Sequence, residues 1–355
     1  MPDQSPTFEK YSAVNGHDKG PTEFLAENPV SPELATAMMK LAPANHFCTK
    51  SYAEAMRADG RQIWLLGSKR GEQLVAGCYG FIRSRPLYRV LLIQSVPDVA
   101  CDDVFWDGLT RFCSGHQIHR LELNGLGWSG ARIPPLPGKL ERYEQYDEYV
   151  LDLGDPEWEQ KLPRNHRRNI KRAMRAGVTL QRTTSPDACL EHVGLMAASR
   201  ERRRKRGEAI NGNRERELTY SILLVEKGAG ELFQVVGGGK VLSSGLVLRA
   251  AEGAWFESSG HSPEGMKCGT AHFLWYSIIR QLREERKRVL NTGETEPHSG
   301  LSRFKAGFGA RPVSAERATF YICSELRKRA TDAARALRHF PSAILGRIGL
   351  GGRPF

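Results

Sequence analysis

The sequence predicts an α/β protein built from two similar domains, each a mixed, twisted sheet flanked by helices. The main observation is an internal repeat, because residues 62–125 and 232–293 both follow the order strand, glycine-containing turn, strand, helix, strand. A shift of 168 residues superimposes Gly77 on Gly245, Phe105 on Phe273, Arg120 on Arg288, Leu121 on Val289 and Gly125 on Gly293. A long repeat indicates two related domains rather than a solenoid array. The chain of 355 residues is long enough for two separate cores.

The N-terminal domain is expected over residues 31–150. Residues 1–30 are polar, lack the apolar run of a secretion signal and are predicted to be a flexible leader. Ser31 and Pro32 are typical of the N-cap and first position of a helix. The elements expected next are a helix at 52–59, strands at 62–67, 73–82 and 87–94, a helix at 102–115 and a strand at 118–123.

The C-terminal domain is expected over residues 151–322. The glycine- and proline-rich run 125–138 interrupts regular structure, and we expect the strand at 148–153 to cross between the domains. A basic helix at 161–176 ends at Gly177, and further segments are a strand at 178–181, a helix at 185–206 and the second copy of the repeat. Gly238 and Gly239 fit a hairpin turn. Residues 323–355 are predicted to form a basic amphipathic tail.

The composition restricts the class of protein. A net charge of +12 attracts polyanions but does not choose between nucleic acid, anionic lipid and phosphorylated small molecules, and a high isoelectric point without such a ligand is the alternative. No apolar stretch is long enough to span a membrane. The seven cysteines are scattered without a metal-binding spacing, which predicts reduced thiols, a cytoplasmic protein and no metal site.

The basic helix is the first region that suggests chemistry. Arg164 and Arg168 share one face with Arg172, and Arg167 begins a neighbouring row with Lys171 and Arg175, whereas Ile170 and Met174 are expected to face the core. Like charges at this spacing repel, so a phosphate-rich ligand would stabilise the helix. The alternative is a solvated basic face.

Two further regions contain candidate site residues. In residues 254–265 a strand ends in small polar residues, and Glu257 and His261 are candidate proton acceptors, although a surface position is the alternative for each. In residues 300–313 three glycines allow tight turns, Phe304 and Phe308 anchor the segment, and Arg303 and Lys305 are expected to project toward an anion or a developing oxyanion. A phosphate-binding P-loop and a nucleophile elbow are both missing from the sequence.

Taken together, the repeat, the basic helix and the glycine-rich motif resemble the FemAB-like proteins, which consist of two domains of the GNAT (N-acetyltransferase) fold. The resemblance covers residues 55–322, and its most specific segments are 164–178, 256–279 and 300–313. It implies two tandem GNAT-like domains and an acyltransferase that forms an amide by direct attack of an acceptor amine on an activated acyl ester.

The resemblance also implies roles for individual residues. Lys305 would stabilise charge near the scissile ester, Phe304 would shape the site, and Glu257 is the third candidate catalytic residue. Arg164, Arg167, Arg168, Arg303 and His261 are candidates for substrate binding. The family often has an acidic residue where this chain has Asn291, and Glu294 would substitute only if the turn brings it inward. Because the first copy lacks an equivalent of residues 304–309, the second domain is expected to carry the reaction and the first to supply an acceptor wall.

The donor and the partners remain open at this point. Aminoacyl-tRNA is the preferred donor because of the charge, and acyl-CoA is the alternative, with a sugar or cell-envelope precursor as acceptor; either donor is a co-substrate rather than a bound cofactor. A small-molecule or lipid-linked amine is the expected acceptor. An alternative of another class is a non-catalytic RNA- or membrane-binding protein. The tail either contacts anionic lipid at the inner face of the membrane or docks on the protein itself.

Overall fold

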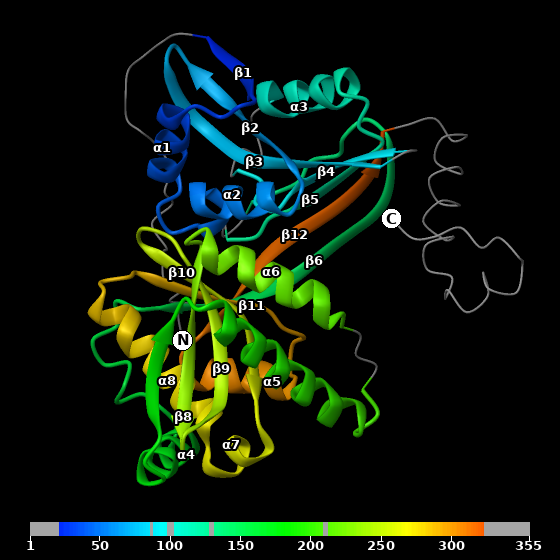
Figure 1. Ribbon diagram of the computed structural model, residues 1–355. Helices are drawn as coiled ribbons and strands as arrows, with labels where there is room; N and C mark the ends of the chain where they lie inside the picture. The colour runs from blue at the N-terminus through cyan, green and yellow to red at the C-terminus, as the bar shows by residue number, and fades with distance from the viewer. Residues whose placement is uncertain (1–20, 86–87, 98–102, 128–130, 209–211, 323–355) are drawn as a thin grey trace, which may run out of the picture.

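The computed structural model describes residues 21–322 except 86–87, 98–102, 128–130 and 209–211 (Figure 1). Its central feature is a twelve-stranded sheet with the strand order β1-β2-β3-β4-β5-β12-β6-β11-β10-β9-β8-β7. This order is symmetric about its central pair, because β1–β5 on one side correspond to β7–β11 on the other. The predicted fold class, an α/β protein of two similar domains with mixed sheets and flanking helices, is confirmed. None of the described helices is both long and apolar enough to cross a membrane.

The N-terminal half forms the upper part of Figure 1. Its elements are β1 (Thr22–Glu27), α1 (Pro32–Leu41), a 3-10 turn (His46–Cys48), α2 (Lys50–Ala58), β2 (Gln62–Arg70), β3 (Gln73–Arg85), β4 (Tyr88–Ile93), α3 (Asp103–Gly115) and β5 (Arg120–Asn124). Strands β1 to β4 are antiparallel, and β4 pairs with β5 in parallel. The helix α3 makes the crossover that a parallel pair requires.

The C-terminal half repeats this arrangement. Its elements are β6 (Lys139–Asp152), α4 (Arg164–Arg175), β7 (Thr179–Thr183), α5 (Pro186–Arg204), α6 (Arg214–Glu226), β8 (Gly230–Gly237), β9 (Lys240–Arg249), β10 (Gly253–His261), α7 (Pro263–Cys268), α8 (Thr270–Glu284), β11 (Val289–Glu294), α9 (Gly300–Gly307) and β12 (Arg311–Tyr321). Strands β7 to β10 are antiparallel, β10 and β11 are parallel, and α8 takes the place of α3. The predicted repeat is therefore a repeat of structure.

The two halves exchange their last strands. β6 follows β5 in the chain but pairs with β11, and β12 follows β11 but pairs with β5. The exchanged strands also pair with each other over the whole length of β12, from Arg311↔Val150 to Tyr321↔Lys139. Both run diagonally between the two halves in Figure 1. The strand predicted to cross is thus real and longer than expected, and the boundary at residue 150 remains a prediction because β6 continues through it.

Three hydrophobic clusters hold these elements together. One lies around α3, one lies between α4, α8 and the second sheet, and the third joins the halves through Tyr52 of α2, Leu224 of α6 and Trp255 of β10. The hairpin predicted at Gly238 and Gly239 joins β8 to β9, and both glycines have positive φ, as a two-residue turn of this kind requires.

The flexible leader predicted over residues 1–30 extends too far, because Thr22–Glu27 form β1 and pair with β2. The ring of Phe24 packs on α3 at Gly108, where a Cβ would lie 2.0 Å from that ring. A strand that is stabilised by a partner so distant in sequence has no strong local signal. Residues 1–20 of the leader and the tail predicted at 323–355 lie outside the described residues.

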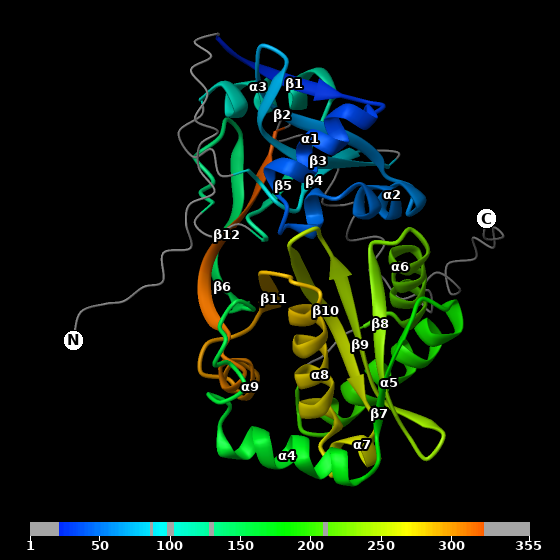
Figure 2. The ribbon, with the colours of Figure 1, turned by 90° about the vertical axis from the view of Figure 1, so that its left-hand side faces the viewer.

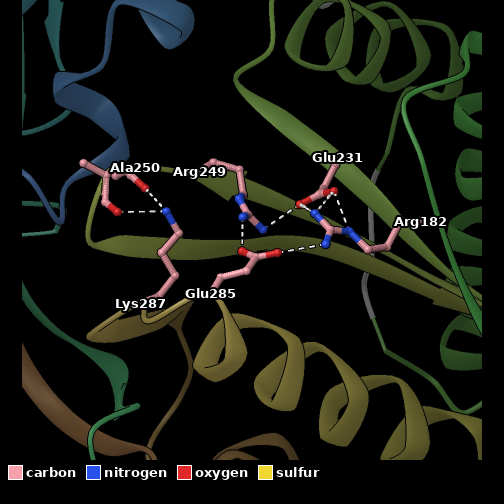
Figure 3. A network of polar contacts seen from close by, with 7 residues as sticks. Arg182, Glu231, Arg249, Ala250, Glu285 and Lys287 are labelled. Carbon is pink, nitrogen blue, oxygen red and sulfur yellow. Dashed lines mark hydrogen bonds and ion pairs between the residues drawn. The ribbon is translucent and has the colours of Figure 1, made fainter.

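An ionic network ties the outer strands of the second sheet to the end of α8 (Figure 3). Glu231 of β8 accepts hydrogen bonds from Arg182 of β7 and Arg249 of β9, and Glu285 at the C-cap of α8 accepts from the same two arginines. The side chain of Glu285 is 22% exposed. Four charges that share hydrogen bonds in a partly buried site stabilise more than isolated surface pairs do.

We therefore expect Glu285→Gln to lower the free energy of unfolding by about 1–3 kcal/mol, because two arginines lose a charged acceptor. The neighbouring residue provides the control, since Glu284 pairs with Arg280 and both side chains are more than half exposed. Glu284→Gln should change the stability by less than about 0.5 kcal/mol. Urea unfolding of both variants measures the difference, and equal effects would contradict a structural role for the network.

Candidate active site

The strands β10 and β11 separate in the middle of the second sheet. Their parallel pairing ends at Trp255↔Asn291, although β10 continues to His261 and β11 to Glu294. A bulge between Phe256 and Ser258 redirects β10 at this point, and the pairing of β11 with β6 is irregular between Asn291 and Glu294. Bulges commonly re-aim side chains beside active sites. The separated edges therefore define the candidate site.

Lys305 lies at the β11 side of this separation. Its Nζ is buried and donates to the carbonyl oxygens of Thr292 at 2.6 Å, Gly293 at 2.9 Å and Glu294 at 3.3 Å. An ammonium group has three donors, so all of them are used. Burial lowers the pKa of Lys305 to about 8, against the opposing effect of Glu148 and Glu294. Lys305 thus supplies hydrogen-bond donors to carbonyl oxygens of β11 at the place where β11 no longer pairs with β10. Its catalytic role remains a prediction.

Phe304 belongs to an aromatic cluster that joins three helices. Its ring centroid lies 5.5 Å from that of His166 on α4, and 5.0 Å and 5.2 Å from those of His272 and Trp275 on α8. The Nε2 of His166 donates to the carbonyl oxygen of Phe304 at 3.2 Å. Gly307 is needed for this contact, because a Cβ there would lie 2.4 Å from the His166 ring. The cluster fixes α4 against the helix that carries Lys305.

The segment 300–307 is a helix rather than the series of tight turns that its glycines suggested. Ser299 caps it by accepting a hydrogen bond from the backbone N–H of Ser302. The helix separates two residues that were expected to project together, because Lys305 points inward while Arg303 is exposed and donates to the carbonyl oxygen of His298. A contribution of Arg303 to substrate binding stays a prediction.

Glu257 lies on the β10 side of the separation, within the bulge. Its Oε2 accepts a hydrogen bond of 3.0 Å from Nε1 of Trp255. Burial raises the pKa of Glu257, which the hydrogen bond from Trp255 partly offsets. The ring of Trp255 reaches across to Gly293 on β11, where a Cβ would lie 3.7 Å from Cζ2. Glu257 and Lys305 therefore lie on the two sides of the same opening.

His261 ends β10 in a polar environment. Its Nδ1 lies 2.9 Å from Oγ of Ser243, and its carbonyl oxygen accepts from Arg202. Burial, followed by the charge of Arg202, lowers the pKa of His261 to about 4. The imidazole is therefore neutral at physiological pH and a weak proton acceptor. A contribution of His261 to substrate binding stays a prediction.

The basic helix presents its cations to solvent. His166, Ile170 and Ala173 form its buried face, and the exposed face carries Arg164, Arg167, Arg168, Lys171, Arg172 and Arg175. None of these six cations makes an ion pair within the described part of the chain. The prediction that Met174 faces the core is wrong, because its side chain is 45% exposed and the helix turns its 166–170–173 face to α8 instead.

The sequence did not reveal the most unusual carboxylate of the site, Glu148 on β6. It is 2% exposed, and its Oε2 accepts hydrogen bonds from Asn291 Nδ2 at 2.9 Å and from the backbone N–H of Gly127 at 3.1 Å. Glu294, the alternative to Asn291, is half exposed and pairs with Arg317, so the turn does not bring it inward. The sequence signal that could have pointed to Glu148 is that an acidic residue begins the predicted crossing strand.

Comparisons with known proteins agree with the observed fold. Residues 160–305 match a family model described as "Acetyltransferase (GNAT) domain". No curated protein matches the chain. Among solved structures, the chain is similar to "Crystal structure of FemX", with 14% identity, a TM-score of 0.62, and coverage of 82% of this chain and 96% of that one.

Two other solved structures show the same fold. The C-terminal domain of a putative lysylphosphatidylglycerol synthetase from Agrobacterium fabrum is 15% identical, with a TM-score of 0.51 and coverage of 86% of this chain and 96% of that one. A tandem GNAT protein from the clavulanic acid biosynthesis pathway, described without AcCoA, is 11% identical, with a TM-score of 0.52 and coverage of 86% and 100%. The C-terminal half thus carries a GNAT acetyltransferase domain, and the chain is an acyltransferase of the GNAT fold.

A buried histidine beside the site predicts acid sensitivity. The ring nitrogens of His192 lie 3.0 Å from Ser244 Oγ and 2.9 Å from Ser258 Oγ, and burial, followed by His261, lowers its pKa to about 4. The unfolded chain binds the proton more readily, so this contribution is complete above about pH 6.5 and is lost as the pH falls toward 4, by up to about 3 kcal/mol. His192→Gln should flatten the fall in stability between these pH values.

The exposed His298 is a matched control, and asparagine suits its positive φ. His298→Asn should retain the acid sensitivity of the natural protein. Urea unfolding across this pH range compares the variants, and an unchanged profile in His192→Gln would refute the assignment.

Proposed function

We propose that this acyltransferase forms an amide by direct attack of an acceptor amine on an activated acyl ester, with aminoacyl-tRNA as the donor. Lys305 and Phe304 lie at the scissile ester, and Glu257 lies on the opposite side of the opening. Arg164, Arg167 and Arg168, with Arg303 and His261, contribute to substrate binding. The N-terminal half supplies the wall against which the acceptor binds.

One observation carries this proposal. The helix with six exposed cations, α4, is packed through His166 directly on α9, the helix that contains Lys305. Figure 2 shows α4 along the lower edge of the molecule, next to α7, α8 and α9. A polyanion bound along α4 would relieve the repulsion between its arginines and place its reactive end near Lys305. A small acyl ester is too short to contact a basic surface that extends along the whole of α4.

The chemistry follows from the groups at the opening. Attack on an ester builds negative charge on its carbonyl oxygen, and a preorganised cation in a water-poor site stabilises that charge. Lys305 provides such a cation if one of its N–H groups turns from a β11 carbonyl oxygen to the developing oxyanion. Positioning of donor and acceptor supplies the remaining acceleration, so no covalent intermediate is required.

A second candidate keeps the reaction and changes the donor. Acyl-CoA would serve as donor and a sugar or cell-envelope precursor as acceptor. The match to an acetyltransferase domain and the likeness to a tandem GNAT protein whose description mentions AcCoA favour this candidate.

We expect the purified protein to form an amide from charged tRNA and an amine, and Lys305→Ala to lower the rate by at least about 10²-fold through loss of the oxyanion partner. Lys287→Ala is a matched control, since Lys287 also donates to two backbone carbonyl oxygens, those of Ala250 and Ala251, but lies in the network of Figure 3. Mass spectrometry of the products measures both variants. Turnover with acyl-CoA and none with charged tRNA would reverse the choice of donor.

The basic helix is tested separately. Replacing Arg164, Arg168 and Arg172 together by glutamine should lower kcat/KM for charged tRNA by about 10- to 100-fold and reduce its salt dependence, because phosphate contacts are lost. Transfer from a small aminoacyl ester without the tRNA should be unaffected. The triple replacement of Arg203, Arg204 and Arg206 controls for net charge, since these arginines already pair with Glu201 or Glu208. Equal losses in both triple variants would exclude α4 as a specific surface.

A further inference from the structure

Among the described residues, three buried side-chain atoms lack a hydrogen-bond partner where the exchanged strands cross: Nε of Arg317, which lies 3.6 Å from Glu144 in an ion pair, and two oxygen atoms on β6. The two oxygen atoms are Oε1 of Glu148 and the hydroxyl of Tyr146, and both have no hydrogen bond within the described residues. The two residues are two positions apart on β6, so their side chains lie on the same face of the strand. Buried polar groups are almost always paired in native proteins, and unpaired ones call for a specific explanation.

The position of Glu148 is fixed by both halves of the protein. Its Oε2 is held by the amide of Asn291 from β11 and by the N–H of Gly127 from the N-terminal half. The orientation of the Asn291 amide is fixed as well, because its Oδ1 accepts a hydrogen bond of 2.8 Å from the N–H of Gly293. One carboxylate oxygen is therefore anchored, while the other has no hydrogen-bond partner among the described residues.

The surrounding charges tune this carboxyl group. Lys305 faces it from α9, Glu294 from β11, Tyr146 from β6, and Arg317 reaches the Tyr146 ring from β12. Burial raises the pKa of Glu148 to about 7; the hydrogen bonds from Asn291 and Gly127 oppose this shift, Glu294 adds to it, and Lys305 opposes it. Burial, followed by the charge of Glu148, raises the pKa of Tyr146, and the neighbouring guanidinium of Arg317 only partly opposes this shift, so the hydroxyl stays neutral.

We propose that Glu148 and Tyr146 form the acceptor subsite for a primary amine, and that Glu148 Oε1 accepts a proton from the acceptor's ammonium group. The proposal rests on the proposed amide-forming function. An ammonium group offers donors to both unpartnered oxygens, and a carboxylate near its own pKa at physiological pH is suited to proton transfer. The subsite also explains why Asn291 stands where an acidic residue was expected. The carboxylate comes instead from Glu148 on β6, the strand paired with β11, and Asn291 orients it.

The step balances. Glu148 takes one proton from the ammonium, and the freed nitrogen forms the C–N bond with the acyl carbonyl carbon. The C–O bond to the ribose of the donor then breaks, or the C–S bond if the donor is a thioester. The second proton of the nitrogen goes to the leaving oxygen or sulfur, and Glu148 finally releases its proton to solvent.

The test compares two nucleophiles. Butylamine is protonated at neutral pH and needs a proton acceptor, whereas hydroxylamine is already uncharged. With an aminoacyl ester donor, Glu148→Gln should lower the rate with butylamine by about 10²- to 10⁴-fold, remove the rise in rate near pH 7, and leave the rate with hydroxylamine within about threefold. Glu141→Gln, an exposed glutamate on the same strand, should behave like the natural protein. An equal effect of Glu148→Gln on both nucleophiles would overturn the inference.

A binding measurement separates this inference from the proposed function. Butylammonium titrated into the natural protein and followed by NMR should bind at least about tenfold more tightly than to Glu148→Gln, whether or not any donor is turned over. Tyr146→Phe removes only the unpartnered hydroxyl, so it should fold and weaken binding by about 2- to 10-fold. Binding that is unchanged in both variants would refute the subsite, whereas binding without turnover of any donor would refute only the proposed function.

Discussion

The exchange of β6 and β12 is the constraint on which the rest of the structure depends. Each half completes its sheet with the strand that follows the other half in the sequence. As a result, β12 pairs with β5 on one side and with β6 on the other. Either half alone would lack a partner strand for the backbone groups at its inner edge. Leaving such groups buried and unpaired is costly. The exchange therefore fixes both the relation of the halves and the place where their polar residues meet. Glu148, Arg317 and Glu294 gather there because three strands from distant parts of the chain become neighbours.

The opening between β10 and β11 is stabilised by the same constraint. A strand that parts from its neighbour leaves carbonyl oxygens without partners, and the Nζ of Lys305 supplies donors to three of them. The helix α9 can deliver that lysine because it connects β11 to β12 and is held against α4 by His166. The side chain of Lys305 thus both stabilises the opening and is the candidate catalytic group. For this reason Lys287, which also donates to backbone carbonyl oxygens, is the informative control.

What the sequence predicted well was periodic or local. The repeat, the hairpin at Gly238 and Gly239, the N-cap at Ser31 and the existence of the basic helix all have signals within a few residues. What it missed depends on contacts between distant segments. β1 is a strand because β2 lies beside it, Met174 is exposed because α4 docks through His166, and Glu148 meets Asn291 across 143 residues of sequence. A pattern within one segment does not predict contacts between residues so far apart in the sequence.

The duplication also explains why the candidate site lies in the second half. In the first half the corresponding strands β4 and β5 pair through Ile93↔Leu123, and the junction is then closed by a bridge between Ser95 and Gly125. The N–H of Val96 donates to the carbonyl oxygen of Asn124, and that of Leu126 donates to the carbonyl oxygen of Gln94. Beyond Trp255↔Asn291 the second half has no such closure between β10 and β11. Closed backbone has no donors or acceptors left for a substrate, and this difference between the halves is why we place the proposed reaction in the second.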